Sequence, residues 1–494
     1  MSRSKGQRRG SPGANLELQT LEPRLLLSTA ASPDLAVNVL ETGMTFPKSP
    51  VPGDRGAVAV VVANDGAAAA IGTVKVSAFL SPHHSLSTDG TLIGSRQLAV
   101  SLAPGKQVTV MVPVTIADMS SGTKWVIGQV TAIRMDPESN TSNNVDTAAT
   151  NVNLQRSFGA VPGRQGSTML TLTNPATGHP VTFSLTGPGT ATVSSDFHIA
   201  VTGSTSATII SIRPQGNELL RVRDVAVVGG LGDFLAPNVD LAGDFSVHTG
   251  SVQFISLDTM TGGTLSVPRN LIRLDAAQLT GGAAIKADTI QMVNVIGRSN
   301  QTTVPAKFDA SLLAHDTQGF STAITQVRVL GNASGSIITE HGGIRQVIVT
   351  GSMQNLAIFS ASDIGTVQAG AMQGSAVVAG SSRYHETVAP GSTAKINSIV
   401  VTGAAAQHGV GFGNSVIGAG TVVMAKIIGV NPNNSAGGGA MKTNMLPNVL
   451  HEEGIFVRQR VGVVVVSEAG GPLKTFTQTS VDPVILPNFF IRML

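Results

Sequence analysis

The densest group of side chains that could hold a metal ion lies in one nine-residue stretch, Asp-Pro-Glu-Ser-Asn-Thr-Ser-Asn-Asn at 136–144. Asp136, Glu138, Asn140 and Asn143 offer hard oxygen donors at close spacing, which suits calcium. Asn and Asp side chains also accept hydrogen bonds from the backbone of their own turn. With only two carboxylates, the stretch favours a self-capped turn. The sequence therefore assigns no metal site; Asp136, Glu138 and Asn140 are the residues that would hold one, with calcium as the ion.

Acid–base catalysis would need carboxylates aligned on one face of the molecule. The acids between 219 and 430 fall at different offsets within the repeat described below, and no two share a stripe. Only inserted loops could bring Asp309, Asp316 or Glu386 together. Tyr384, in the insertion 381–390, could contact a ligand, although an exposed loop is the ordinary interpretation. The sequence indicates no catalytic and no cofactor-binding residue.

The histidines form no metal-binding set. His83 and His84 are an adjacent pair, and successive residues of a strand point to opposite faces. The segment His-Glu-Glu-Gly at 451–454 lacks the second histidine of a zinc-protease helix. The absence of cysteine excludes disulfides, thiolate metal ligands and thiol nucleophiles.

The elements that carry these residues are strands. Between 33 and 150 apolar residues alternate, as in Val58, Val60 and Val62, and Pro-Gly and Asn-Asp-Gly turns separate the runs. Alternation over five to seven residues between turns is typical of half-buried antiparallel strands. We expect a β-sandwich of about 100 residues, with Trp125 filling the space between its two sheets.

Segment 33–150 resembles the CARDB family, the cell-adhesion-related domain of bacteria. The resemblance runs through Asp34-Leu35, Pro52-Gly53, Asn64–Gly66, Phe79–Ser81 and Leu102–Gly105, and its most specific part is the 136–144 stretch. Thr141 stands where the family usually has another acid. The resemblance implies an immunoglobulin-like module on an extracellular protein, without catalysis.

A repeat between 219 and 430 predicts the second architecture. Its pattern is an apolar residue followed by apolar residues three and five positions later. The pattern occurs at Val222/Val225/Val227, Val252/Ile255/Leu257, Leu271/Leu274/Ala276, Ile290/Val293/Val295, Ile324/Val327/Val329, Ile344/Val347/Val349, Ile364/Val367/Ala369 and Ile396/Ile399/Val401. Steps of 19 or 20 residues with β-branched side chains are typical of one coil of a parallel β-solenoid. Longer steps of 30, 34 and 32 residues would hold inserted loops.

Two further features complete the expected solenoid. Glycine follows the pattern's first residue by seven positions at Gly229, Gly297, Gly331, Gly351 and Gly403, which predicts a corner with positive φ. A second apolar position follows by fourteen at Ile285, Ile338, Ile358 and Val378. The alternating strands of 155–218 predict a small linking β-region. Segment 450–494, with an apolar strand pair at 454–466, predicts a C-terminal cap.

The net charge is concentrated at the start of the chain. Residues 1–24 carry the whole formal net charge of +3, and no basic run follows them. A nucleic-acid-binding surface needs clustered basic residues, so the sequence argues against nucleic acid. No apolar run approaches the about 18 residues of a membrane helix, so we expect no transmembrane segment.

Segment 1–32 has the character of a targeting segment: it is basic and rich in Gly, Ser and Pro. Leu21-Glu22-Pro23-Arg24-Leu25-Leu26-Leu27-Ser28 resembles the LEPR-XLL leader of large, repetitive bacterial exported proteins. That resemblance implies an exported protein at the cell surface or outside the cell.

Together these observations predict an all-β chain: an Ig-like sandwich, a linking β-region, and a right-handed parallel β-helix or solenoid with a cap. The expected role is structural or adhesive and non-catalytic, with cell-surface polysaccharide or other surface proteins as partners. The alternative is a carbohydrate-binding or polysaccharide-processing β-helix, with its chemistry in insertions 299–318 and 380–395.

Overall fold

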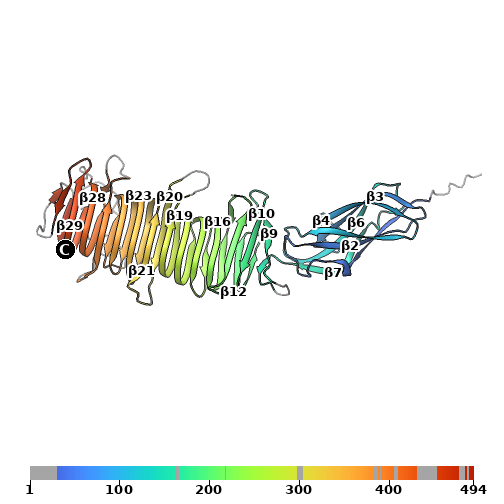
Figure 1. Cartoon of the computed structure of the whole chain (residues 1–494), viewed down its shortest axis with the longest axis horizontal. Helices are drawn as coiled ribbons and strands as arrows, with labels where there is room; N and C mark the ends of the chain where they lie inside the picture. Colours follow the sequence, from blue (N-terminus) through green and yellow to red (C-terminus); the bar gives the residue numbers. More distant parts are fainter. Residues whose placement is uncertain are drawn as a thin grey trace, which may run out of the picture.

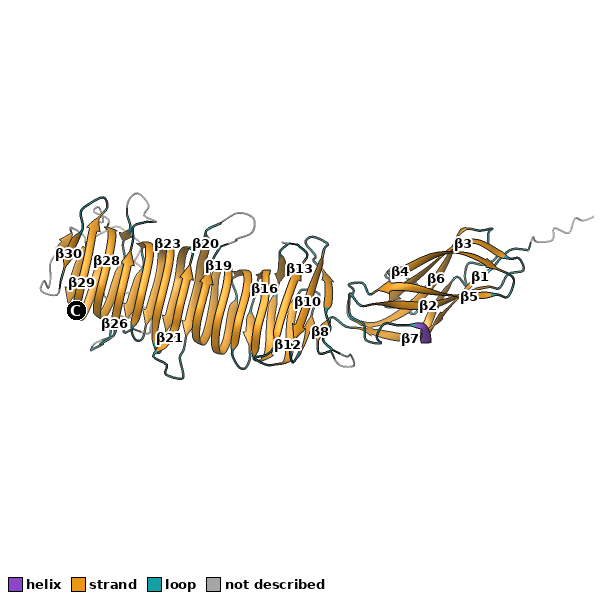
Figure 2. Cartoon of the chain, viewed as in Figure 1, coloured by secondary structure: helices purple, strands orange, loops and turns teal. Residues whose placement is uncertain are grey.

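The structure of the chain is a computed structural model. It describes residues 31–161, 166–216, 218–297, 304–381, 388–389, 391–404, 410–430, 453–477, 484–486 and 489–493. A β-sandwich stands at one end and a long stack of strands follows it (Figure 1). In the described residues the one helical element is the short 3-10 helix η1 (Glu41–Gly43) (Figure 2). The predicted all-β class, a sandwich followed by a parallel stack, is confirmed.

The sandwich consists of two antiparallel sheets. One sheet contains β1 (Leu35–Leu40), β2 (Arg55–Asn64) and β5 (Gln107–Thr115). The other contains β4 (Thr91–Leu102), β3 (Ala70–Ser81), β6 (Gly122–Arg134) and β7 (Val145–Leu154). Every second residue of β2 points into the space between the sheets, where Val58, Val60 and Val62 are fully buried, and this explains the alternation of apolar residues in the sequence.

The expected position of Trp125 is wrong. Its side chain is half-buried and lies outside the sandwich core, with its ring 4.4 Å from the ring of His84 in an edge-to-face contact. The next residue, Val126, is fully buried and belongs to that core. The indole therefore lies outside the core, which contains Phe46 together with aliphatic residues.

Antiparallel strands open the solenoid. They are β8 (Ser157–Gly159), β9 (Leu170–Thr173), β10 (Pro180–Thr186), β11 (Thr190–Val193), β12 (His198–Ser204) and β13 (Ile209–Pro214). β9–β10–β13 and β8–β11–β12 pair antiparallel, whereas β12 pairs in parallel with β15 and β13 with β16. The linking region is thus continuous with the sheets of the solenoid and covers their first parallel strands.

The solenoid strands pair with one another in parallel, and they range from two residues to the 32 residues of β19. They are β14 (Leu220–Val222), β15 (Asp224–Gly229), β16 (Leu231–Leu241), β17 (Phe245–Val247), β18 (Val252–Thr261), β19 (Thr264–Val295), β20 (Ala306–Ala314), β21 (Thr322–Val329), β22 (Gly331–Thr339), β23 (Gly343–Ser360), β24 (Ile364–Gln373), β25 (Ala376–Ala379), β26 (Lys395–Val401), β27 (Phe412–Gly413) and β28 (Val416–Val430). Each coil turns through three faces before it reaches the next rung.

We name the faces by their strand segments. Face A comprises 231–236, 252–257, 271–276, 290–295, 322–329, 343–349, 364–369, 395–401, 421–427 and 461–466. Face B comprises 239–241, 259–261, 278–280, 306–308, 331–333, 352–354, 371–373 and 412–413. Face C comprises 225–227, 245–247, 265–267, 283–287, 310–314, 335–339, 356–360, 376–379, 416–419 and 454–457.

Seven of the eight repeat units that the sequence indicates lie in register on face A, and the first does not. Val225 pairs with Phe245 on face C, and Val222 pairs with Leu241 on face B. The true predecessor of Val252/Ile255/Leu257 is Leu231/Phe234/Ala236. The step of 30 residues is therefore not a coil with an insertion. The same apolar spacing also occurs across a corner, with the first residue on one face and the next two on the following face, as Val222, Val225 and Val227 show.

The predicted glycine corners divide into two kinds. Gly229, Gly297 and Gly403 have the expected positive φ, of 123°, 75° and 71°. Gly331 and Gly351 do not, and their need for glycine has another cause. A Cβ on Gly331 would lie 1.9 Å from the Ala306 carbonyl oxygen, and one on Gly351 would lie 2.3 Å from Asn332 Oδ1. At these positions the rungs approach too closely for a side chain.

The second apolar positions also divide. Ile285 and Ile358 are buried in the main core as expected. Ile338 and Val378 instead belong to a small outer cluster around Phe359, Ala376 and Val388 on face C. This position is therefore not a reliable marker of the core.

The C-terminal region differs from the expected strand pair. β29 (Glu453–Glu468) is one strand that pairs in parallel with β28 and adds a further coil. β32 (Phe489–Met493) pairs in parallel with β29, while β30 (Lys474–Phe476) and β31 (Val484–Leu486) pair antiparallel at the outer edge. These antiparallel pairings close part of the last coil, as a cap must.

The sandwich contributes directly to the open end of the solenoid. Val51, in the loop before β2, is fully buried in the solenoid core with Leu170 and Phe158. The Thr171 backbone N–H donates to the Pro52 carbonyl oxygen at 3.1 Å. Gly53 has a φ of 94° and packs so closely on Thr171 that a Cβ would lie 2.9 Å from its side chain. The loop therefore acts as part of the N-terminal cap.

An ion pair also links the two parts at this joint. Arg156 Nη1 lies 2.9 Å from Asp118 Oδ1, with side chains 11% and 18% exposed. Asp118 Oδ2 also accepts a hydrogen bond from the Thr173 backbone N–H at 2.8 Å. Asp118 thereby ties the sandwich to both the connecting chain and β9.

Candidate functional site

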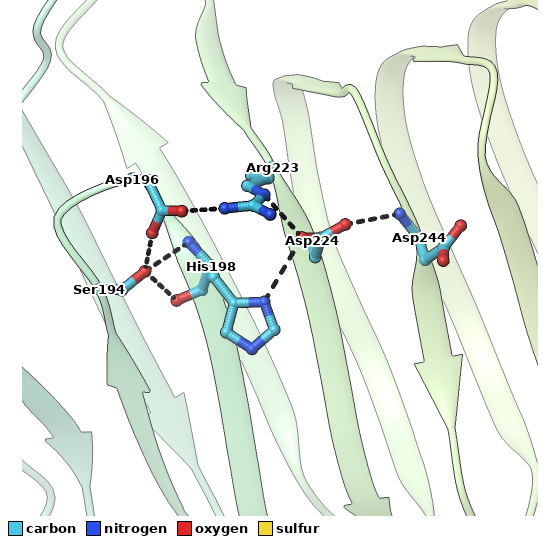
Figure 3. Close-up of polar contacts among 6 residues, drawn as sticks. All are labelled: Ser194, Asp196, His198, Arg223, Asp224 and Asp244. Atoms are coloured by element: carbon cyan, nitrogen blue, oxygen red, sulfur yellow. Dashed lines mark hydrogen bonds and ion pairs between the residues drawn. The ribbon is translucent and has the colours of Figure 1, made fainter.

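The largest connected group of charged side chains among the described contacts lies at one corner of the first coils. We call Ser194, Asp196, His198, Arg223, Asp224 and Asp244 the corner cluster (Figure 3). Ser194 and Asp196 lie in the turn between β11 and β12, and His198 begins β12. Arg223 directly precedes β15, Asp224 begins it, and Asp244 directly precedes β17. The parallel register pairs His198 with Asp224 and Val225 with Phe245, so residues far apart in sequence become neighbours.

The turn holds its acid in a fixed position. Phe197 has a φ of 59°, an uncommon conformation for a bulky residue, and its ring is buried in the core. Ser194 Oγ donates to Asp196, and Arg223 Nη1 forms an ion pair with the same carboxylate. The hydroxyl hydrogen bond and the guanidinium lower the pKa of Asp196 to about 2. Asp196 is therefore an anion throughout the physiological pH range.

Asp224 connects three rungs. Its Oδ2 lies 3.1 Å from Arg223 Nε and 3.6 Å from His198 Nδ1, and its Oδ1 accepts the Asp244 backbone N–H at 2.9 Å. Asp244 repeats the arrangement, because its Oδ1 accepts the Thr264 backbone N–H at 2.7 Å. Each acid thus caps the N–H group of the next coil.

The space for this ladder depends on glycine. A Cβ on Gly243 would lie 2.2 Å from Asp224 Oδ1, and one on Gly263 would lie 2.2 Å from the Gly243 carbonyl oxygen. Gly243 therefore leaves room for the Asp224 carboxylate beside the backbone, whereas Gly263 permits the close approach of two adjacent rungs.

The corner cluster contains Ser, His and Asp, but their contacts are not those of a nucleophilic triad. A triad needs the serine hydroxyl bonded to the imidazole and the imidazole oriented by the acid. Ser194 Oγ bonds instead to the His198 backbone N–H and carbonyl oxygen, and donates to Asp196. The Ser194 contacts stay within its own turn, and none of the described contacts joins its hydroxyl to the His198 imidazole.

The weak metal candidates in the sandwich are drawn into separate contacts. Glu138 Oε2 accepts the Leu35 backbone N–H at 3.1 Å, and Oε1 accepts Asn144 Nδ2 at 2.8 Å. Asn140 Oδ1 accepts from the backbone and hydroxyl of Ser142, as a self-capped turn predicts. Asp136 is exposed. The stretch fastens the start of β1 to the end of β6.

Two amide oxygens of this turn, Asn143 Oδ1 and Asn144 Oδ1, are buried without a hydrogen-bond partner among the described residues. Their amide nitrogens face carboxylates, because Asn143 Nδ2 donates to Asp34 Oδ1 at 3.1 Å and Asn144 Nδ2 to Glu138. N–H donors therefore already occupy both nearby acids. Within the described part of the chain no three His, Asp or Glu side chains are grouped so as to hold a metal ion.

Asp309, Asp316 and Glu386 are the acids that inserted loops could have brought together, and the structure describes the first two. Asp309 lies within β20 and accepts Ser334 Oγ at 3.0 Å. Asp316 follows that strand, is 1% exposed, and accepts the Phe320 backbone N–H at 2.8 Å. Asp309 lies at the corner between faces B and C, whereas Asp316 lies in the turn after β20, and the two acids accept hydrogen bonds from different partners. Glu386 and Tyr384 lie outside the described residues, as do 1–30 and His451.

The sequence reasoning named none of the six members of the corner cluster as a site residue. The signal available in the sequence was the 20-residue spacing of Asp224, Asp244 and Thr264, which equals the length of one coil. It could be interpreted only with the register between rungs, which the misplaced Val222 unit obscured.

Comparison with known proteins returns a partial likeness. No family model matches the chain, and no curated protein matches it. Among solved structures, it is similar to the CARDB domain of a Pyrococcus furiosus protein in complex with di-metal ions, at 23% identity. That match covers 25% of this chain and 89% of that chain, with a TM-score of 0.18.

A solution structure of the same domain matches at 23% identity, covering 25% of this chain and 96% of that chain, with a TM-score of 0.18. A β-glucosidase from Listeria innocua matches at 16% identity, covering 25% of this chain and 16% of that chain, with a TM-score of 0.17. A CARDB domain is thus among the structures that this chain is similar to. No helix of the described residues has the length and apolar character needed to cross a membrane.

Proposed function

We propose that the chain is a non-catalytic structural or adhesive protein, exported to the bacterial cell surface or extracellular matrix. In this role the solenoid is a stiff spacer that holds the sandwich and the inserted loops at a fixed separation. The observation that carries the proposal is the shared core: a single hydrophobic cluster extends from Val51 of the sandwich through Phe158 to Ile491.

A shared core makes a stiff rod because each coil buries its apolar face only against its neighbours. The Asp118–Arg156 pair and the seating of Val51 extend this dependence across the joint. Intrachain domain joints usually permit relative motion unless the interface is large and apolar. A joint with a buried valine, a paired charge and a backbone hydrogen bond resists such motion.

The corner cluster supports the same role. Asp224 and Asp244 satisfy backbone N–H groups that a coil edge would otherwise leave to solvent. The exposed charges of this cluster are engaged in holding adjacent rungs together. That use of acids suits a scaffold.

Protease shaving of intact producing cells tests the location and the role together. Released peptides identified by mass spectrometry should come from exposed turns, such as the one around Lys106 in the sandwich and the one around Phe320 in the solenoid. A cytoplasmic marker protein serves as the control for lysis. Recovery of these peptides only after lysis would reject the proposal.

A further inference from the structure

The last six rungs of face A carry an unusual distribution of charge. Their segments contain no Asp or Glu. Five cations lie on these rungs or directly before them, and we call them the basic strip: Arg328, Arg345, Lys395, Lys426 and Arg460. All five side chains are exposed.

The register aligns these cations along the solenoid. Arg328 pairs with Ile348, which continues through Gln368 and Val400 to Lys426 in a single column. Four rungs of spacing separate Arg328 from Lys426 by about 19 Å. Lys395 and Arg460 both pair with Thr421 at the leading edge of the face. Arg328 and Lys426 therefore share one column, and Lys395 and Arg460 share the leading edge.

The positive charges of the basic strip are not paired with acidic side chains of the described residues. No ion pair joins any of its five side chains to another described residue. The adjacent acid, Asp363, precedes the face and accepts the Lys395 backbone N–H at 2.8 Å. Five positive charges thus face solvent.

The earlier rungs of the same face show the contrast. Arg273 is held by Asp275 through two hydrogen bonds, at 2.9 and 2.6 Å, and Asn294 Nδ2 donates to the same carboxylate at 2.8 Å. Asp233 adds another negative charge there. The positive field is therefore confined to the C-terminal half of the face.

The neighbouring side chains indicate the kind of polyanion. Gln326 and Gln346 are joined across rungs by a hydrogen bond of 2.8 Å, and Gln368 and Asn397 add exposed amides. Amides and cations hydrogen-bond the hydroxyl and carboxylate groups of sugars. The segments contain no aromatic residue on which nucleic-acid bases would stack.

We propose that the basic strip binds an acidic polysaccharide, lying along the solenoid axis across several rungs. Charge complementarity along one direction favours an extended chain with repeated carboxylate or sulfate groups. This proposal deepens the proposed function, because it names the partner class of the adhesive surface.

Binding by the purified full chain tests the proposal with heparin and polygalacturonate as probes. The variant R328Q/R345Q/K426Q removes three strip cations. The matched control K106Q/K286Q/K307Q removes the same charge from the sandwich and the other two faces. A charge near a polyanionic surface contributes about a factor of five in affinity, so the strip variant should bind about a hundredfold more weakly. The control should bind as the unaltered chain does.

Salt and competing polymers sharpen the test. The affinity for the acidic polymers should fall as NaCl is raised from about 50 to about 300 mM, because salt screens surface charges over this range. Neutral dextran should not bind. The proposal is overturned if neither acidic polymer binds at low salt, if the control loses affinity equally, or if single-stranded DNA binds more tightly than both. Because the assay uses purified protein, its failure is separable from a failed surface-shaving result.

Discussion

Replacing Asp118 by alanine is expected to loosen the joint between sandwich and solenoid. The substitution leaves Arg156, a side chain only 11% exposed, without its carboxylate, and its Nε is already buried without a hydrogen-bond partner among the described residues. Breaking one side of a buried ion pair costs about 3–5 kcal/mol. Because these side chains reach solvent at the edge of the joint, we expect the lower value, about 3 kcal/mol, including the lost acceptor of the Thr173 N–H.

A distance measurement between two spin labels reports this loosening directly. The chain has no cysteine, so T115C and T202C place unique labels on exposed positions of the sandwich and the solenoid. The parent pair should give one narrow distance distribution, and D118A should broaden it. D118N, which keeps an acceptor for Thr173 but loses the charge, should fall between them.

Thermal unfolding provides the second measure. A joint that couples the two parts should make them unfold together, and D118A should separate the transitions or lower the first. An unchanged distance distribution with an unchanged unfolding profile would refute the view that Asp118 and Val51 make one stiff unit.

Three further expectations concern single positions. G335A should destabilise the solenoid by about 3 kcal/mol, because the φ is 100° and a Cβ would lie 2.1 Å from the Ala310 carbonyl oxygen. G282A, whose Cβ would meet open space at a φ of 73°, should cost about 1 kcal/mol in the same denaturant titration; equal losses would contradict the packing explanation. E138A should lower sandwich stability by about 1–3 kcal/mol through loss of its bonds to Leu35 and Asn144, whereas exposed D136A should stay within about 0.5 kcal/mol in thermal melts. Asp196 has a folded pKa of about 2 against 3.8 for the free side chain, so its stabilisation is present above pH 3.8 and is lost as pH falls through 2. The difference in Tm between the unaltered chain and D196N should therefore shrink over that interval, and a difference that persists below pH 2 would count against the assignment.

The repeated apolar pattern was sufficient to predict a parallel solenoid, because seven of its eight units lie in register on face A. The pattern could not place Val222, since inward residues on either side of a corner have the same spacing as those on one face. Sequence alone shows which residues are apolar but not where the chain bends.

The candidate site was less predictable for a related reason. Asp196 meets Arg223, and Asp224 meets Asp244, only through pairings between strands, at separations of 27 and 20 residues. The same holds for the basic strip, whose members are scattered from Arg328 to Arg460 in a sequence without a basic run. Turns fixed by local chemistry, such as the hydrogen bonds of Asn140 to Ser142, were within reach of sequence reasoning.

The constancy of the rungs has a consequence for how such a molecule can change length. Ile344 and Ile364 are 20 residues apart, and Ile364 and Ile396 are 32 apart, yet each pair occupies adjacent rungs. Residues inserted at a corner add nothing to the reach of the rod. Its extent can change only by whole coils, in increments of about 4.8 Å, so duplication or loss of one coil would act as a graduated adjustment of the distance between its two ends.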